Sequence, residues 1–327
     1  MILVKKHFLA IAVILSAILF AIFMVYLPIE VAGHRPGNVP LLVVNAGFLA
    51  VTLSFFLVFI LMVITRKEYV LIQITTINRF RHLLLLMVKR DFITRYRRSV
   101  LGVLWSLLNP ILTMLVLTMV FSTLFRFEIE NFPVYLLSGQ LIFNFFSEST
   151  TMAMASITSG AGTIKKVYVP KYIFPVARVM GASVNLVFSI VAFMIVVIVT
   201  QAPFYWTMLL LPIPLLYIFL FSLGAGMFLS AVAVFFRDIN HLWGILLTLT
   251  MFLTPIMYPV DILPDRVFYL IHLNPIFHYV NYFRELAIDG TIPNLWSNII
   301  CIGFALAALS LGAYVKITQQ NKYILYL

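Results

Sequence analysis

Four arginines stand close together just ahead of a long apolar run, and their side chains are the best suited to chemistry in this sequence. Arg90, Arg95, Arg97 and Arg98 precede the apolar stretch that begins at Leu101. A guanidinium is planar and permanently charged, and it donates paired hydrogen bonds to phosphate or carboxylate oxygens. The cluster is therefore a candidate phosphate-binding site, and the alternative is a basic flank that merely borders a membrane span.

Motifs of hydrolytic, metal-dependent and nucleotide-binding sites are absent from the sequence. It contains no H-E-x-x-H, no G-x-S-x-G and no G-x-x-x-x-G-K-[ST]. The six histidines are scattered, and the single cysteine, Cys301, has no second cysteine to pair with. We predict no catalytic residue, no metal site and no cofactor in this chain. If ATP powers it, another chain binds the ATP and Mg.

Composition places most of the chain in lipid. The sequence is 63% hydrophobic and 10% charged, with a mean hydropathy of +1.08. A soluble core of this length could not hide so much apolar surface. The net charge of +11 is divided among segments between apolar runs and does not gather on one polar domain, so we predict contact with membrane lipid and not with nucleic acid.

Runs of about 20 apolar residues predict an all-α polytopic membrane protein with about eight transmembrane helices. The predicted spans are 7–28, 41–65, 101–125, 134–156, 178–200, 208–236, 240–258 and 295–315. We divide the chain into an accessory hairpin at 1–65, a basic cytoplasmic stretch at 66–99 and a six-helix domain at 100–327.

The basic residues indicate the orientation of these spans. With both termini in the cytoplasm, only Arg35, Arg126, Arg266 and Arg284 of the 22 lysines and arginines fall in outer segments. Glu148 falls within a span, where an ionised carboxylate costs about 2.5–3.5 kcal/mol or more. It either faces a polar pathway or a partner, or it is a protonated or hydrogen-bonded packing residue.

Three shorter features carry helical or turn signals. Leu85, Val88, Phe92 and Tyr96 recur at helical spacing opposite the arginines, which predicts an interfacial amphipathic helix on the inner leaflet. Residues 156–178 and 235–240 are inner connections, and the first is long enough for one or two short helices.

The outer segment 258–294 is rich in aromatic residues and prolines. Asn274 as N-cap, Pro275 as first helical residue and Gly290 as stop predict a re-entrant or interfacial helix. Within the preceding spans, Ser222, Gly226 and Ser230, spaced by four, predict a close helix contact.

From about Leu86 to its end, the sequence resembles the membrane subunits of type-2 ABC exporters of O-antigen polysaccharide and teichoic acid. The residues that carry the resemblance are Lys89-Arg90-Asp91-Phe92, Arg95-Tyr96, Ser99 to Trp105, Asn109-Pro110, Lys165 to Pro175, Phe236 to Ile239, Thr254 to Pro259, Leu273-Asn274-Pro275 and Tyr282-Phe283-Arg284. Residues 1 to about 80 depart from the family pattern of six spans.

The resemblance implies a homodimer of permeases bound to two copies of a nucleotide-binding ATPase subunit, exporting a glycan attached to polyprenyl diphosphate across the bacterial cytoplasmic membrane. By position, the residues expected to face the ATPase are Lys165, Lys166, Tyr168, Pro170, Lys171, Arg237 and Asp238. The arginine cluster corresponds to a gate helix where the lipid enters. Sugars favour aromatic faces with a few polar groups. The further candidates for the substrate path are Trp105, Phe143, Phe146, Glu148, Phe252, Tyr258, Tyr282 and Arg284.

Three other functions compete with this one. A drug- or lipid-exporting ABC permease is the nearest. An ion-coupled secondary transporter needs paired broken helices with buried ionisable groups, and only Glu148 qualifies. A membrane-bound sugar transferase needs clustered acids for a metal, whereas the outer acids are dispersed.

The predicted orientation is tested by thiol labelling in a Cys301→Ser background. A cysteine at Arg35 should react with an impermeant maleimide added to intact cells, because that residue lies in an outer segment. A cysteine at Lys166 should react only after the membrane is permeabilised. The opposite labelling pattern would overturn the orientation.

Overall fold

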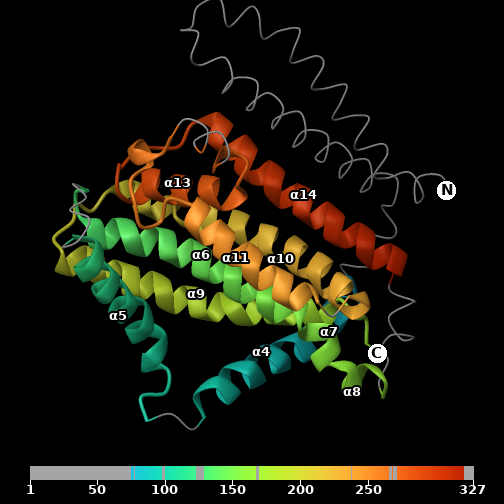
Figure 1. Cartoon of the computed structure of the whole chain (residues 1–327). Helices are drawn as coiled ribbons and strands as arrows, with labels where there is room; N and C mark the ends of the chain where they lie inside the picture. Colours follow the sequence, from blue (N-terminus) through green and yellow to red (C-terminus); the bar gives the residue numbers. More distant parts are fainter. Residues whose placement is uncertain are drawn as a thin grey trace, which may run out of the picture.

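The computed structural model describes residues 75–319 except 77, 98–99, 123–128, 167–168, 237, 265–266 and 268–270. The predicted accessory hairpin at 1–65 and most of the basic stretch lie outside the described residues. Within them the secondary structure is helical and contains no strand, as the sequence predicted (Figure 1). The helices are α4 Arg81–Tyr96, α5 Leu104–Val120, α6 Phe132–Met154, α7 Ser156–Ser159, α8 Ala161–Ile164, α9 Ile173–Val199, η3 Trp206–Leu210, α10 Pro212–Phe235, α11 Ile239–Leu253, η4 Val260–Ile262, α13 Pro275–Ala287 and α14 Leu295–Gln319.

Three of these elements are long and apolar enough to cross a membrane: Ile173–Val199, Trp206–Phe235 and Leu295–Lys316. They correspond to the predicted spans 178–200, 208–236 and 295–315. The helix in the place of span 134–156 is α6, which has 23 residues but many polar ones. The helices in the places of 101–125 and 240–258 are α5 and α11, which are apolar but shorter.

The predicted span 240–258 ends five residues beyond Leu253, the last residue of α11. The helix has 15 residues and ends at Leu253, so it is about 22 Å long. Thr254 is extended (ψ 128°) because it precedes Pro255, whose ring disfavours helical geometry in the preceding residue. The predicted span to 258 is corrected accordingly, and residues 254–258 form a turn.

The core is organised around α6. Its residues 136–143 are all buried, and it packs against α5, α9, α10 and α13. Phe146 continues the core toward the other end, with its ring 5.5 Å from that of Phe221 and 5.9 Å from that of Trp243. In Figure 1, α6, α9, α10 and α11 run side by side, and α4 and α5 form the arms of a V below them.

The tightest helix contact joins α10 to α14, through glycines that the sequence analysis did not single out. A Cβ on Gly224 would collide with the backbone of Ala308 and Leu309, and one on Gly312 would lie 2.6 Å from the Gly224 carbonyl oxygen. The series of small residues predicted to form a close helix contact, at 222, 226 and 230, also lies at a contact of α10. Ser222 and Ser230 are buried, and a Cβ on Gly226 would lie 2.7 Å from Ala153 of α6.

Helix α13 has the predicted beginning and end. The Asn274 side chain accepts a hydrogen bond from the Ile276 amide (3.0 Å), and Pro275 is the first helical residue. The helix ends at Ala287, and Gly290 follows in the left-handed region (φ 66°).

The residues through which α4 contacts the rest of the protein are not those of the predicted apolar face, which is expected to lie on the inner leaflet. Leu84 and Met87 are buried, whereas Leu85 is 58% exposed. Leu84 and Met87 pack against Val169, Tyr172, Ile173, Phe174 and Ala177. The segment at the start of α9 thus decides which side of α4 is covered, and helical periodicity alone could not identify that neighbour.

We predict that Gly224→Ala destabilises the protein by about 1–3 kcal/mol, the usual cost of an overpacked core. The control is Gly181→Ala in α9, because a Cβ at Gly181 meets nothing within 4 Å. Thermal unfolding of the purified protein in detergent measures the difference. Equal unfolding temperatures for the two variants would contradict the close α10–α14 contact.

Candidate functional site

A polar cavity of about 630 Å³ lies where the end of α4 and the start of α5 meet α6 and α9. The described residues of its walls carry two aromatic rings, one proline, an arginine and a glutamate of opposite charge, and otherwise neutral amide and hydroxyl groups. The lining residues are Arg95, Tyr96, Trp105, Ser106, Asn109, Pro110, Thr113, Asn144, Ser147, Glu148, Asn185 and Ser189.

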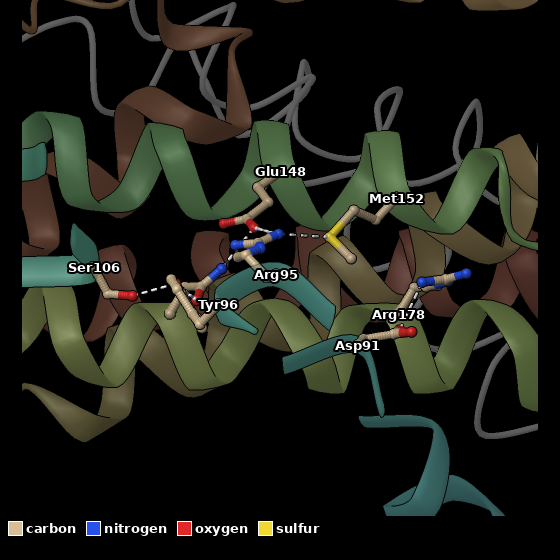
Figure 2. A network of polar contacts seen from close by, with 8 residues as sticks. Asp91, Arg95, Tyr96, Ser106, Glu148, Met152 and Arg178 are labelled. Carbon is tan, nitrogen blue, oxygen red and sulfur yellow. Dashed lines mark hydrogen bonds and ion pairs between the residues drawn. The ribbon is translucent and has the colours of Figure 1, made fainter. Parts of the chain in front are cut away.

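An ion pair crosses this cavity from α4 to α6. Arg95 Nη2 lies 2.6 Å from Glu148 Oε1, and the side chains are 40% and 29% exposed (Figure 2). Asn185 Nδ2 donates to the same carboxylate oxygen, also at 2.6 Å. Glu148 therefore has two donors directed at one of its oxygens.

Tyr96, also in the last turn of α4, makes a second set of hydrogen bonds, which join α4 to α9 and α5. The Tyr96 hydroxyl donates to Asn185 Oδ1 (3.3 Å) and shares a hydrogen bond with the Ser106 hydroxyl. Asn185 is thus bonded through its oxygen to α4 and through its nitrogen to α6. The arrangement holds the last turn of α4 against α5, α6 and α9.

The polar groups reach one cavity because they repeat at helical spacing. Asn144, Ser147 and Glu148 are three and four residues apart on α6, and Asn185 and Ser189 are four apart on α9. Such spacing puts side chains on one face of a helix. Except for Arg95, Trp105 and Glu148, the sequence analysis did not select these lining residues as substrate-path candidates. The polar stripes on otherwise apolar helices were the signal that could have identified them.

A second ion pair fastens α4 to α9 beside the cavity. Arg178 Nη1 donates to Asp91 Oδ2 at 2.6 Å, and the side chains are 22% and 12% exposed (Figure 2). Neither residue lines the cavity. Together with the apolar contacts of Leu84 and Met87, this pair anchors α4 along most of its length.

The structure brings only one arginine of the predicted cluster into the cavity. Arg95 lines it, whereas Arg90 is exposed with Asp91 Oδ1 3.7 Å away, and Arg97 is exposed after the end of α4. Arg98 lies outside the described residues. Of the other candidates for the substrate path, Trp105 and Glu148 also line the cavity.

The remaining substrate candidates lie elsewhere. Phe143 and Phe146 are buried in the core, and Phe252 is 65% exposed on α11. The Tyr258 hydroxyl donates to the Phe252 carbonyl (2.6 Å), and the buried Tyr282 donates to Asn298 Oδ1 (2.7 Å). None of these residues lines the cavity.

Arg284 is buried near the N-terminal end of α6, where it donates mainly to backbone carbonyl groups. It donates to Ser138 Oγ (3.2 Å) and to the carbonyl oxygens of Pro255 (2.8 Å), Tyr135 (3.1 Å) and Ile256 (3.2 Å). Its guanidinium carbon also lies 3.5 Å from the centroid of the Tyr135 ring. These contacts tie α13 to α6 and to the turn after α11.

The described residues expected to face an ATPase lie in the two connections 156–178 and 235–240. Lys165, Lys166 and Asp238 are exposed, and Pro170 is partly buried. Burial lowers the pKa of the Lys171 ammonium. Tyr168 and Arg237 lie outside the described residues. The predicted short helices of 156–178 are α7 and α8.

Potential metal-ligating side chains are dispersed in the part of the chain that the structure describes. No three His, Cys, Asp or Glu side chains come together there as metal ligands would. Cys301 is buried in α14, where its carbonyl oxygen accepts a hydrogen bond from the Tyr279 hydroxyl (3.0 Å).

The described part of the chain is a helical bundle with apolar spans, which is the architecture of a multi-pass membrane protein. Residues 82–288 match the family described as ABC-2 type transporter, so the chain belongs to this family. The family predicted from the motifs is thereby confirmed, and the chain is a transport subunit of the inner membrane.

Three relatives illustrate the similarity. The O-antigen export system permease protein RfbA of Klebsiella pneumoniae is 28% identical over 248 residues, which cover 74% of this chain and 95% of that protein. RfbA of Myxococcus xanthus is 31% identical, with coverage of 66% and 84%. The polysialic acid transport protein KpsM of Escherichia coli is 26% identical, with coverage of 71% and 91%.

We predict a coupling of about 0.5–1 kcal/mol between Arg95 and Glu148, the usual range for partly exposed pairs. Arg95→Glu alone should destabilise the protein through carboxylate repulsion, and adding Glu148→Arg should recover stability. The control is Lys89→Glu, since Lys89 is exposed on the same helix and does not line the cavity. A double-mutant cycle of unfolding free energies measures the coupling, and strict additivity would refute it.

Proposed function

We propose that the chain is the permease subunit of an ABC exporter that moves a polysaccharide linked to polyprenyl diphosphate across the cytoplasmic membrane. The observation that carries the proposal is the polar cavity at the end of α4, in a chain whose relatives include an O-antigen export system permease protein and a polysialic acid transport protein. Its amide and hydroxyl groups suit a hydrated glycan, and Arg95 suits a phosphate.

A separate ATPase supplies the energy in this proposal. The sequence has no phosphate-binding loop of its own, so ATP and Mg belong to two copies of a nucleotide-binding subunit on a homodimer of this chain. Lys165, Lys166, Lys171 and Asp238 are the described residues expected to face the ATPase. The segment that follows α8 also packs against α4 through Val169 and Tyr172, so a push on it would reach the cavity.

The chain divides functionally as its sequence suggests. Residues 100–327 form the exporter domain, 66–99 carry the helix that leads to the cavity, and 1–65 are an accessory hairpin, with both termini in the cytoplasm. In this orientation Glu148 lies in the inner half of α6 and Arg95 in the last turn of α4, and the proposal brings a phosphate head to them from the inner leaflet.

Deletion of the gene should abolish surface glycan and leave lipid-linked glycan inside the cell, because the permease is its only route. Arg95→Gln should reduce export about tenfold, whereas Lys89→Gln should leave it unchanged. Surface glycan measured by immunoblot checks both. Parental levels of surface glycan in the deletion strain would refute the proposal. If that strain instead became sensitive to drugs, the result would favour an ABC drug exporter.

The purified chain alone should hydrolyse no ATP. Reconstituted with its cognate nucleotide-binding subunit, it should give a complex with ATPase activity. ATP hydrolysis by the isolated chain, measured as phosphate release, would contradict the proposal that a separate subunit hydrolyses the ATP.

A further inference from the structure

The Glu148 carboxylate stands where an external anion would be bound. Arg95 Nη2 and Asn185 Nδ2 both lie 2.6 Å from a single carboxylate oxygen, Oε1. A guanidinium and an amide directed at one oxygen form a site for an oxyanion, because a phosphate oxygen accepts the same bonds. The position of Oε1 marks the place of such an oxygen.

We propose that Glu148 is an internal competitor for the phosphate of the transported lipid, and that binding of the phosphate releases Glu148 from Arg95. This inference rests on the proposed function and adds to it the group that keeps the site occupied before substrate arrives. The ligand chemistry is a phosphate or diphosphate, from either a lipid head or a free anion.

The exposure of the pair makes the exchange feasible. Arg95 is 40% and Glu148 29% exposed, and both line a cavity of about 630 Å³. Pairs exposed to this degree contribute little to stability, so a doubly charged competitor can separate them. Besides Glu148, Arg95 contacts the Met152 sulfur at 3.7 Å, a weak acceptor, and forms a hydrogen bond with the side chain of Tyr96.

The neighbouring ion pair differs from this one in its surroundings. Asp91 and Arg178 are equally close but only 12% and 22% exposed, and neither lines the cavity. They anchor α4 while its last turn carries the exchangeable pair, as Figure 2 shows. Release of Glu148 therefore breaks the ion pair between the end of α4 and α6, while Tyr96 and Asp91 still hold α4 on α5 and α9.

Binding can be measured on the full chain in nanodiscs of neutral lipid. Trp105 lines the cavity, so its fluorescence reports an occupant, and a Trp105→Phe variant identifies its share of the signal. The probes are farnesyl diphosphate, inorganic pyrophosphate and uncharged farnesol. Farnesyl diphosphate binding without pyrophosphate binding assigns the site to a lipid head, and equal affinity for both assigns it to a free anion.

Glu148→Gln should tighten diphosphate binding about fivefold, because it removes the competing charge and keeps a group that accepts from Asn185. Arg95→Gln should weaken binding more than tenfold. Lys89→Gln, which removes a charge from the same helix outside the cavity, should change it less than twofold. If Glu148→Gln is poorly folded, Glu148→Ala provides the same comparison, with gel filtration as the check on folding.

Unchanged or weaker binding in both Glu148 variants would overturn the proposal. Glycan export by the parent chain is a separate measurement. If export requires the chain but the Glu148 variants do not bind more tightly, the competitor is refuted while the permease function stands. If the parent chain has no role in export, the proposed function itself fails.

Discussion

An ionised side chain among apolar helices needs a partner inside the chain, and this constraint shapes the molecule at three places. Glu148 is paired with Arg95, Asp91 with Arg178, and Arg284 with backbone carbonyls. Each interaction joins segments remote in sequence: α4 to α6, α4 to α9, and α13 to α6. Because an unpaired buried charge costs several kcal/mol, the positions of α4 and α13 around the core depend mainly on the Asp91–Arg178 pair and on the contacts of Arg284, and the more exposed Arg95–Glu148 pair adds less.

The sequence specifies the fold where the signal is local. The start of α13 was predictable because Asn274 and Pro275 act on adjacent amides. The short helices α7 and α8 and the three long apolar spans were predictable from length and composition. The buried face of α4 was not, because Leu84 and Met87 are covered by the segment at 169–177, which no pattern within α4 identifies.

The candidate site was accessible from the sequence only in part. Charge and position drew attention to Arg95 and Glu148, but nothing in the sequence paired them, since 52 positions separate them along the chain. The amides and hydroxyls of the cavity are spread over α5, α6 and α9, and each is unremarkable alone. Aromatic residues gave a weak signal because they are so numerous. The chain has 30 phenylalanines, and most rings serve packing, as Phe143 and Phe146 do.

Charge balance links the cavity to its proposed occupant. With Arg95 and Glu148 paired, the two ionisable side chains of opposite charge in its wall cancel, and the cavity offers an uncharged but polar surface. A diphosphate entering beside the intact pair would meet a carboxylate as well as a guanidinium, so attraction and repulsion would largely offset each other. Displacing the carboxylate removes the repulsion at the site itself and turns the full charge of Arg95 toward the ligand. An anionic head group is thus favoured only when the contact between α4 and α6 opens, which couples recognition of the head to movement of the helix end.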